Sequence, residues 1–161
     1  MSDVTLTIDG TEVTVPAGTN IWAAAKQVGI AIPSLCHDER MDPVGVCRMC
    51  VVDVGGRVLA ASCVRSCAEG MHVTTTSDAI EAHHRMLTEL LMSEQPETCA
   101  KEATTADSEL HVLARRYDAW GDSLPRGGGR TSDDSSHVIA VDHQACILCD
   151  RCIRGCDEIQ H

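Results

Sequence analysis

The chain of 161 residues contains no phenylalanine, two tryptophans and one tyrosine. A hydrophobic core must therefore be assembled from valine, isoleucine, leucine, methionine and alanine, which suits one ordinary domain or small compact modules. Acidic residues outnumber basic ones, and the formal charge is −11 at pH 7. Because phosphate binding requires an excess of lysine and arginine, this charge argues against a nucleic-acid partner.

Long apolar segments are missing as well. No window has the run of apolar residues that a membrane span requires, and the start, MSDVTLTIDG, lacks the basic and apolar regions of a signal peptide. These absences predict a cytoplasmic protein. Ten cysteines are present, and disulfides are rare in a reducing compartment, so metal binding is the leading explanation for the cysteines.

The first part of the chain predicts a β-grasp domain over residues 1–76, and hence an α+β fold. Apolar and polar residues alternate on both sides of a central Asp-Gly pair, which favours a tight hairpin turn. A short helix through IWAAAKQV is expected to be capped by Thr19 or Asn20, and Gly29 suits a left-handed residue at its end. VVDV-GG-RVLA then predicts a second hairpin, and MHVTTT a closing strand.

The following segment, residues 77–121, is predicted to be helical. Asp78 and Glu81 have the spacing of a capping box, and apolar residues then recur at helical spacing, so a helix is expected from about 78 to 93. A second amphipathic helix is predicted in SELHVLARRYDAW. Its apolar stripe comprises Leu110, Leu113, Tyr117 and Trp120. Residues 122–136 are rich in Gly, Ser, Pro and Asp and predict a linker.

Four cysteines of the first domain have the spacing Cys36-x10-Cys47-x2-Cys50-x12-Cys63. Iron–sulfur clusters prefer soft thiolate ligands, and this set is predicted to hold a [2Fe–2S] cluster. A zinc ion bound by four cysteines is the alternative, but zinc sites usually combine two Cys-x2-Cys pairs, whereas Cys36 and Cys63 are single. Cys67 is interpreted as a small packed residue near the cluster, with exchange into the ligand set as the alternative.

Two further residues of this segment are candidates for tuning such a cluster. Gly45 has no Cβ, which would let the backbone approach inorganic sulfides. Arg48 lies between two of the cysteines. The Arg48 charge either shifts the reduction potential of the predicted cluster or is an ordinary solvated surface charge.

Residues 33–73 contain PSLCHDERMDPVGVCRMCVVDV and SCVRSCAEGMHV. These stretches resemble the N-terminal [2Fe–2S] domain of a family with three branches. The branches are the large iron–sulfur subunit of NADH-quinone oxidoreductase, the alpha subunit of NAD-dependent formate dehydrogenase, and the diaphorase subunit of bidirectional hydrogenases. The stretch DPVGVCRMC most resembles the formate dehydrogenase branch.

The resemblance implies an electron-transfer segment of a cytoplasmic NAD-dependent formate dehydrogenase. Such a segment relays electrons between a molybdopterin catalytic domain or subunit and a flavin/NAD-binding diaphorase subunit. The alternatives are the equivalent segment of a hydrogenase diaphorase or of NADH-quinone oxidoreductase, or a free-standing ferredoxin. The sequence itself shows no paired nucleophile and base, no dinucleotide fingerprint and no molybdopterin ligand, so no catalytic residue is assigned.

The chain departs from this family in residues 95–108. Family members usually carry His-x3-Cys-x2-Cys-x5-Cys there, which binds a [4Fe–4S] cluster. The corresponding positions hold Gln95, Cys99, Glu102 and Ser108. A single thiolate cannot hold a cubane, so this site is interpreted as lost while its helical scaffold remains. Cys99 is then a packed or free thiol.

The last cysteines have the spacing Cys146-x2-Cys149-x2-Cys152-x3-Cys156, which is that of half a bacterial two-cluster ferredoxin. They predict the beginning of a [4Fe–4S] domain over residues 137–161. In such ferredoxins the first three cysteines ligate one cluster and the fourth ligates the other. The chain is therefore expected to be part of a longer subunit, and this end is expected to be disordered, cluster-free or completed by absent sequence.

Overall fold

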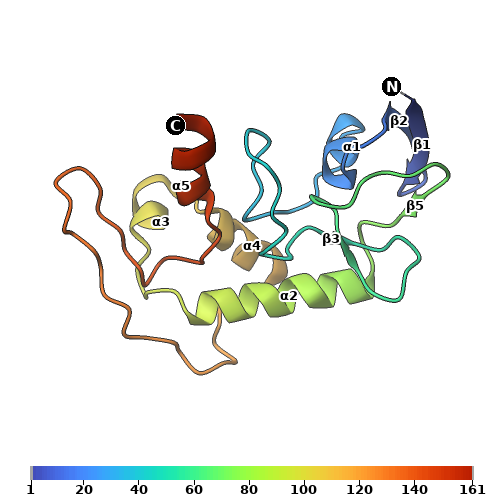
Figure 1. Ribbon diagram of the computed structural model, residues 1–161. Coiled ribbons are helices and arrows are strands. Elements are labelled where there is room, and N and C mark those ends of the chain that lie inside the picture. Colours follow the sequence, from blue (N-terminus) through green and yellow to red (C-terminus); the bar gives the residue numbers. More distant parts are fainter. Residues whose placement is uncertain (1, 161) are drawn as a thin grey trace. The chain divides into compact units, whose positions relative to one another are not determined.

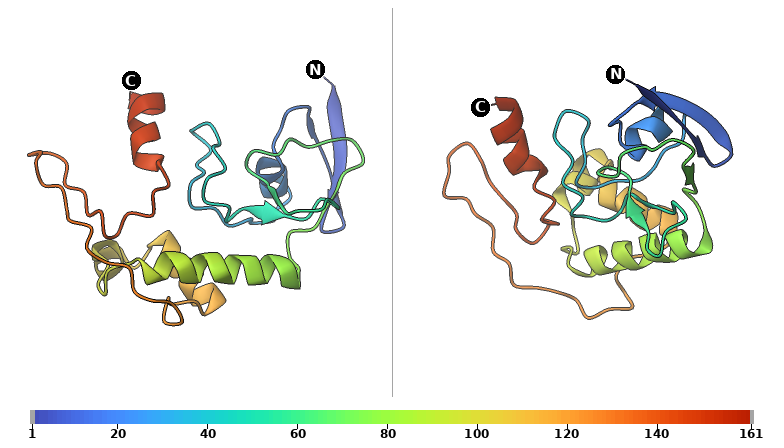
Figure 2. Two further views of the ribbon diagram at one scale, coloured as in Figure 1. Left: turned by 60° about the horizontal axis from the view of Figure 1, so that its bottom comes forward. Right: turned by 45° about the vertical axis from the view of Figure 1, so that its right-hand side comes forward.

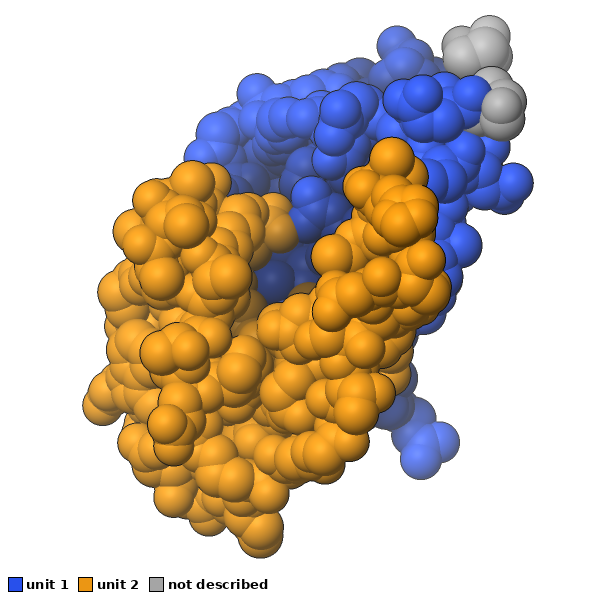
Figure 3. Space-filling model, turned by 90° about the vertical axis from the view of Figure 1, so that its left-hand side faces the viewer, with its two compact units in different colours: residues 1–80, 149–161 blue, residues 81–148 orange. Residues whose placement is uncertain are grey.

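A computed structural model describes residues 2–160, and the chain forms two compact units (Figure 3). The first unit comprises the residues up to Ile80 together with those from Cys149, and the second comprises Glu81–Leu148. Among residues 2–160, no helix is both long and apolar enough to span a membrane. The predicted boundaries after residues 76, 121 and 136 stay predictions.

The first unit begins with the predicted hairpin. Strands β1 (Asp3–Ile8) and β2 (Thr11–Pro16) pair antiparallel along their whole length (Figure 1). Asp9 and Gly10 take φ angles of 47° and 82°, as both central residues of a type I′ turn require. The short strand β5 (His72–Val73) pairs parallel with β1, which gives the sheet order β2-β1-β5.

Helix α1 (Ile21–Gln27) packs its apolar side against this sheet. The Asn20 side chain accepts a hydrogen bond from the Ala23 amide at 2.8 Å, so Asn20 is the N-cap. Gly29 has a φ of 77°, the left-handed conformation predicted for the end of the helix. The sheet contributes Leu6, Ile8, Val13 and Val15 to the core, and α1 contributes Ile21, Ala24 and Ala25.

The second predicted hairpin is present, but its strands are shorter than expected. Strands β3 (Val51–Val52) and β4 (Ala60–Ala61) pair antiparallel over two residues each. The pairing of Val52 with Ala60 leaves residues 53–59 as a loop rather than a two-residue Gly-Gly turn. The Asp53 backbone instead pairs with Thr74, through bonds of 2.9 and 2.8 Å, and its carboxylate accepts a hydrogen bond from the Gly55 amide at 2.8 Å.

Helix α2 (Asp78–Ser93) has the predicted bounds; it begins in the first unit and continues in the second. Its buried His84 lies 3.0 Å from the Tyr117 hydroxyl, measured from Nδ1. Tyr117 belongs to α4 (Glu109–Tyr117), the second predicted amphipathic helix. This hydrogen bond and the burial of Leu110 and Leu113 join α4 to α2 within the second unit.

The predicted stripe on α4 is wrong at its last member. Leu110, Leu113 and Tyr117 are buried, but Trp120 is 38% exposed. Asp118 takes a left-handed φ of 48° and ends the helix, so Trp120 no longer lies on the helical face.

The remaining part of the second unit is irregular. A further helix, α3 (Ala100–Thr105), lies between α2 and α4 and was not predicted as a separate element. Residues 122–136 form no helix, and Asp133 makes a single bridge to Val141. In the first unit the chain ends in α5 (Arg151–Arg154), which continues as a π-helical turn, η1 (Gly155–Gln160).

Candidate metal centre

The cysteine loop, residues 36–50, follows α1 and leads directly into β3. Cys36 and Cys50 are fully buried in it, and Cys47 is partly exposed. Cys63 follows β4 and is also buried. The structure therefore brings all four predicted ligands into the first unit, three of them out of contact with solvent.

The β3–β4 pairing explains how a cysteine beyond the hairpin reaches the loop. Ser62 follows β4 and donates two hydrogen bonds to the Cys50 carbonyl, from its amide at 3.0 Å and from its hydroxyl at 2.7 Å. These bonds fix Cys50 beside the residue that precedes Cys63. A small polar side chain in a fully buried position thus sets the distance between two of the thiols.

The four thiols fall into two pairs. The Cys47 amide lies 3.5 Å from the Cys36 sulfur, to which it donates. Interaction with the Cys63 thiol lowers the pKa of Cys50 to about 6, and interaction with the Cys50 thiol and burial raise the pKa of Cys63. The charges of Cys36 and Cys47 also raise the pKa of Cys63, so the two pairs lie close enough to interact.

This arrangement suits two metal ions better than one. In a [2Fe–2S] cluster with four protein ligands each iron takes two thiolates, whereas zinc needs four donors around a single centre. Among residues 2–160, no three His, Cys, Asp or Glu side chains are arranged as a single-ion site. The zinc alternative is disfavoured by the ligand spacing, in which single cysteines flank one Cys-x2-Cys pair.

Two residues of the loop take conformations that direct its backbone. Arg48, between Cys47 and Cys50, has a φ of 57°, and Gly45 has a φ of 66°. A Cβ on Gly45 would lie 3.2 Å from a Val64 methyl group, in addition to the strain of the left-handed conformation. The structure thus supplies a packing reason for Gly45; the predicted approach of its backbone to sulfides stays a prediction.

Cys67 is a member of the hydrophobic core, as the packed interpretation predicted. It is 7% exposed, its amide donates to the Thr19 carbonyl at 2.8 Å, and burial raises the pKa of its thiol. Its exchange into the ligand set would require this packing to open.

Sequence reasoning did not single out His37 or Arg154. The His37 ring is buried edge-on against Trp22, with ring centroids 4.7 Å apart. Burial and the nearby Arg154 charge lower the pKa of His37. Arg154 belongs to the C-terminal α5 and is distant from His37 in sequence. No local sequence pattern therefore predicts that the two residues lie near each other.

Residues 95–108 of the second unit hold their substituted side chains in other interactions. Gln95 is buried and donates to the Ala145 carbonyl at 3.4 Å. Glu102 forms an ion pair with Arg115. The buried Ser108 hydroxyl lies 3.0 Å from Nδ1 of His111.

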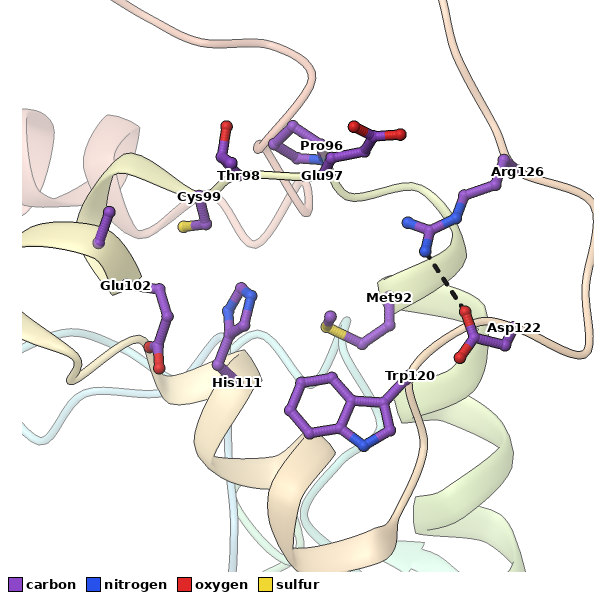
Figure 4. Close-up of a pocket in the computed structure, with 11 residues that line it drawn as sticks. Met92, Pro96, Glu97, Thr98, Cys99, Glu102, His111, Trp120, Asp122 and Arg126 are labelled. Atoms are coloured by element: carbon purple, nitrogen blue, oxygen red, sulfur yellow. Dashed lines mark hydrogen bonds and ion pairs between the residues drawn. The ribbon is translucent and has the colours of Figure 1, made fainter.

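Cys99 lines a cavity of about 680 Å³ in the same unit (Figure 4). Met92 and Trp120 form apolar parts of its wall, and His111 and Glu102 lie across from the Cys99 sulfur. The participation of His111 was not predicted; the signal for it in the sequence is its position three residues after Ser108, the residue that precedes α4.

The last cysteine run is divided between the units, with Cys146 in the second and the other three in the first. The Leu148 amide lies 3.4 Å from the Cys146 sulfur, to which it donates. Leu148 and Asp150 have positive φ angles of 56° and 59°. Cys149 is partly exposed, and Cys152 and Cys156 are exposed.

A family model described as the 2Fe-2S iron-sulfur cluster binding domain matches residues 1–78. Residues 1–78 belong to this family. The 2Fe-2S domain therefore contains the whole of the sheet, α1 and the four paired thiols. The predicted α+β, ferredoxin-like fold and the [2Fe–2S] cofactor are confirmed.

Two curated relatives match nearly the whole chain, including the part beyond the 2Fe-2S domain. A NADH-quinone oxidoreductase subunit of Streptomyces coelicolor is 38% identical over 162 residues, which cover 97% of this chain and 19% of the relative. An NADP-reducing hydrogenase subunit of Solidesulfovibrio fructosivorans, HndD, is 37% identical over 170 residues, which cover 99% of this chain and 28% of the relative. The chain thus spans less than a third of either relative.

The solved structures give the same result. An NAD⁺-reducing [NiFe]-hydrogenase in the H2-reduced state has a chain that superposes with a TM-score of 0.85 at 30% identity. The match covers 96% of this chain and 66% of the other. The 2Fe-2S domain and the segment that follows it are therefore an iron–sulfur electron-transfer segment of the kind found in oxidoreductase and hydrogenase subunits.

Proposed function

We propose that Cys36, Cys47, Cys50 and Cys63 are the ligands of the [2Fe–2S] cluster, with Cys36 and Cys47 on one iron and Cys50 and Cys63 on the other. The observation that supports this assignment is the hydrogen bonding of the site: the Cys47 amide donates to the Cys36 sulfur, and Ser62, which precedes Cys63, donates to the Cys50 carbonyl. When bound, the cluster accepts and releases one electron at a time. The chain's own residues exclude water from it, because three of the four thiols are buried.

We further propose that the chain relays electrons within a larger oxidoreductase. A flavin/NAD-binding diaphorase subunit is the proposed partner on one side. Cys146, Cys149, Cys152 and Cys156 are the proposed ligands of [4Fe–4S] clusters that other sequence completes. The Leu148 amide, which donates to the Cys146 sulfur, supports this role because amide donors to thiolates stabilise bound clusters.

A molybdopterin site that oxidises formate is the proposed electron source, on the strength of the DPVGVCRMC stretch. The matched relatives are named for NADH-quinone and NADP-reducing hydrogenase activities, and either supplies the alternative source. Cluster reduction separates these proposals. In extracts that hold the complete assembly, the [2Fe–2S] EPR signal should develop on addition of formate under argon; development with hydrogen or NADH alone would favour the alternatives.

The ligand assignment is tested by Cys47→Ser in the full chain. Serine is a poor ligand for a sulfide cluster, so we expect loss of most of the iron and loss or severe change of the rhombic EPR signal of the reduced protein. Cys67→Ala is the matched control, since Cys67 is a buried core cysteine of the same domain, and it should keep both. A colourless wild-type protein holding zinc and no iron after anaerobic purification would overturn the assignment.

A further inference from the structure

The C-terminal helix of the first unit lies against the beginning of the cysteine loop (Figure 2). The Arg154 guanidinium donates one hydrogen bond to the Asp42 carbonyl at 2.6 Å and another to the carbonyl of Cys36. The Glu158 carboxylate, one turn later, accepts from the Asp42 amide at 2.8 Å. These bonds join residues more than a hundred positions apart, and they hold the backbone at both ends of the segment from 36 to 42.

Arg151 and Arg154 lie on the same helix but differ in what they contact. Arg151 forms an ion pair with Asp38 at 3.7 Å, so a carboxylate offsets much of its charge. Within residues 2–160, the partners of Arg154 are carbonyl oxygens, and no carboxylate lies within ion-pair distance of it. A guanidinium bound only to neutral acceptors is not neutralised by an ion pair; the Glu158 carboxylate on the Asp42 amide offsets part of its field, and burial of its Nε atom reduces the screening of the remainder by water.

We propose that Arg154 is a positioning residue that raises the reduction potential of the [2Fe–2S] cluster. It does so through its positive charge and through its hydrogen bond to the Cys36 carbonyl. The inference rests on the proposed ligand set, in which Cys36 holds one iron. With four thiolates the oxidised site carries a net charge of about −2, and one added electron makes it about −3 with no bond formed or broken. A fixed cation beside a ligand stabilises the more negative state more, so the equilibrium shifts towards reduction.

The same residue connects the two cysteine segments of the chain. Arg154 lies between Cys152 and Cys156, two of the proposed [4Fe–4S] ligands. Any movement of α5 on cluster binding at Cys152 and Cys156 would also move the Arg154 guanidinium, which is bonded to the Cys36 carbonyl. The geometry therefore couples the C-terminal segment to the potential of the first cluster without a direct contact between cofactors.

The test is an EPR-monitored redox titration of the [2Fe–2S] signal in the full chain and three variants. Arg154→Gln should favour the oxidised cluster by about tenfold, which corresponds to a midpoint potential lower by ~59 mV for one electron. Arg154→Lys, which keeps the charge, should stay closer to wild type. Arg151→Gln is the matched control, and its shift should be clearly smaller than that of Arg154→Gln because Asp38 already offsets the Arg151 charge.

Each outcome is decisive. Equal potentials for Arg154→Gln and wild type, or equal shifts for the two glutamine variants, would overturn the inference. So would loss of the cluster in Arg154→Gln and Arg154→Lys alike, since this would indicate a purely structural role. Loss in Arg154→Gln with retention in Arg154→Lys supports the need for the charge. Absence of a [2Fe–2S] signal in the wild-type protein would instead overturn the proposed function.

Discussion

The cysteine loop of the first unit and residues 95–108 of the second differ in what their side chains contact. In the cysteine loop, backbone bonds from Ser62 and Cys47 direct side chains towards one another, and three of four thiols are buried. In residues 95–108, the side chains point into protein contacts, and Cys99 lines an open cavity. The cysteine loop contains no helix, whereas residues 95–108 contain α3, so the two regions differ in local structure as well as in their donors.

This contrast shows how a protein replaces a metal centre by ordinary packing. Gln95, Glu102 and Ser108 each have a protein partner, namely the Ala145 carbonyl, Arg115 and His111. Buried polar groups without partners cost about 1–3 kcal/mol each. These contacts engage the buried Gln95 and Ser108 side chains and one oxygen of the half-buried Glu102, whose Oε2 has no hydrogen-bond partner. In the first unit the four thiols interact with one another instead, and these interactions shift the pKa values of Cys50 and Cys63 in opposite directions.

The largest expected effect comes from restoring the missing donors. In the triple variant Gln95→His, Glu102→Cys, Ser108→Cys, four donors would again stand at the spacing of the family motif. If only donor identity separates the two regions, anaerobic reconstitution should add about four irons per chain and a second EPR signal. The same variant with Cys99→Ala is the control and should not gain them. An unchanged iron content in the triple variant would show that the scaffold has diverged as well.

Much of the first unit could be predicted from its sequence because its signals are local. The Asp9-Gly10 turn, the Asn20 cap and the bounds of α2 depend on neighbouring residues, and all were confirmed. The length of β3 and β4 could not be predicted, since the Asp53 backbone pairs with the distant Thr74 rather than with the facing strand. Trp120 was misplaced because the left-handed Asp118 ends α4 earlier than the apolar spacing suggests.

The site could be predicted only in part for the same reason. The ligand spacing of the four cysteines is visible in the sequence, but their division into two pairs depends on the register of β3 with β4. The contact of Arg154 with Cys36 joins segments that no periodicity relates. Contacts of this kind arise from tertiary packing, and a single sequence carries no signal for them.

A smaller effect is expected from Tyr117→Phe, which tests whether the second unit is held by packing rather than by metal. The Tyr117 hydroxyl is 3.0 Å from Nδ1 of the buried His84. Its removal should lower the free energy of unfolding by about 1–3 kcal/mol, because a buried hydrogen bond is lost. Urea unfolding monitored by circular dichroism measures this. Val112 is exposed on the same helix, so Val112→Ala is the control and should change the free energy of unfolding by less than about 0.5 kcal/mol. The iron content of both variants should equal that of the wild type.

The smallest expected effect is that of Cys99→Ala. Cys99 is the one thiol among the four positions that correspond to the family's second cluster site, and its neighbours Gln95, Glu102 and Ser108 already have protein partners. Because a single thiolate cannot hold a cubane, removing the Cys99 sulfur should leave the iron content and the EPR spectrum unchanged, in contrast to Cys47→Ser. Electrons would then pass between the proposed C-terminal [4Fe–4S] clusters and the proposed partner by a route that omits this position, with the [2Fe–2S] centre as a direct relay or a side branch. Loss of iron in Cys99→Ala, measured beside Cys47→Ser in the same preparation, would show that the second unit retains a metal centre and that the two regions differ less than their donors indicate.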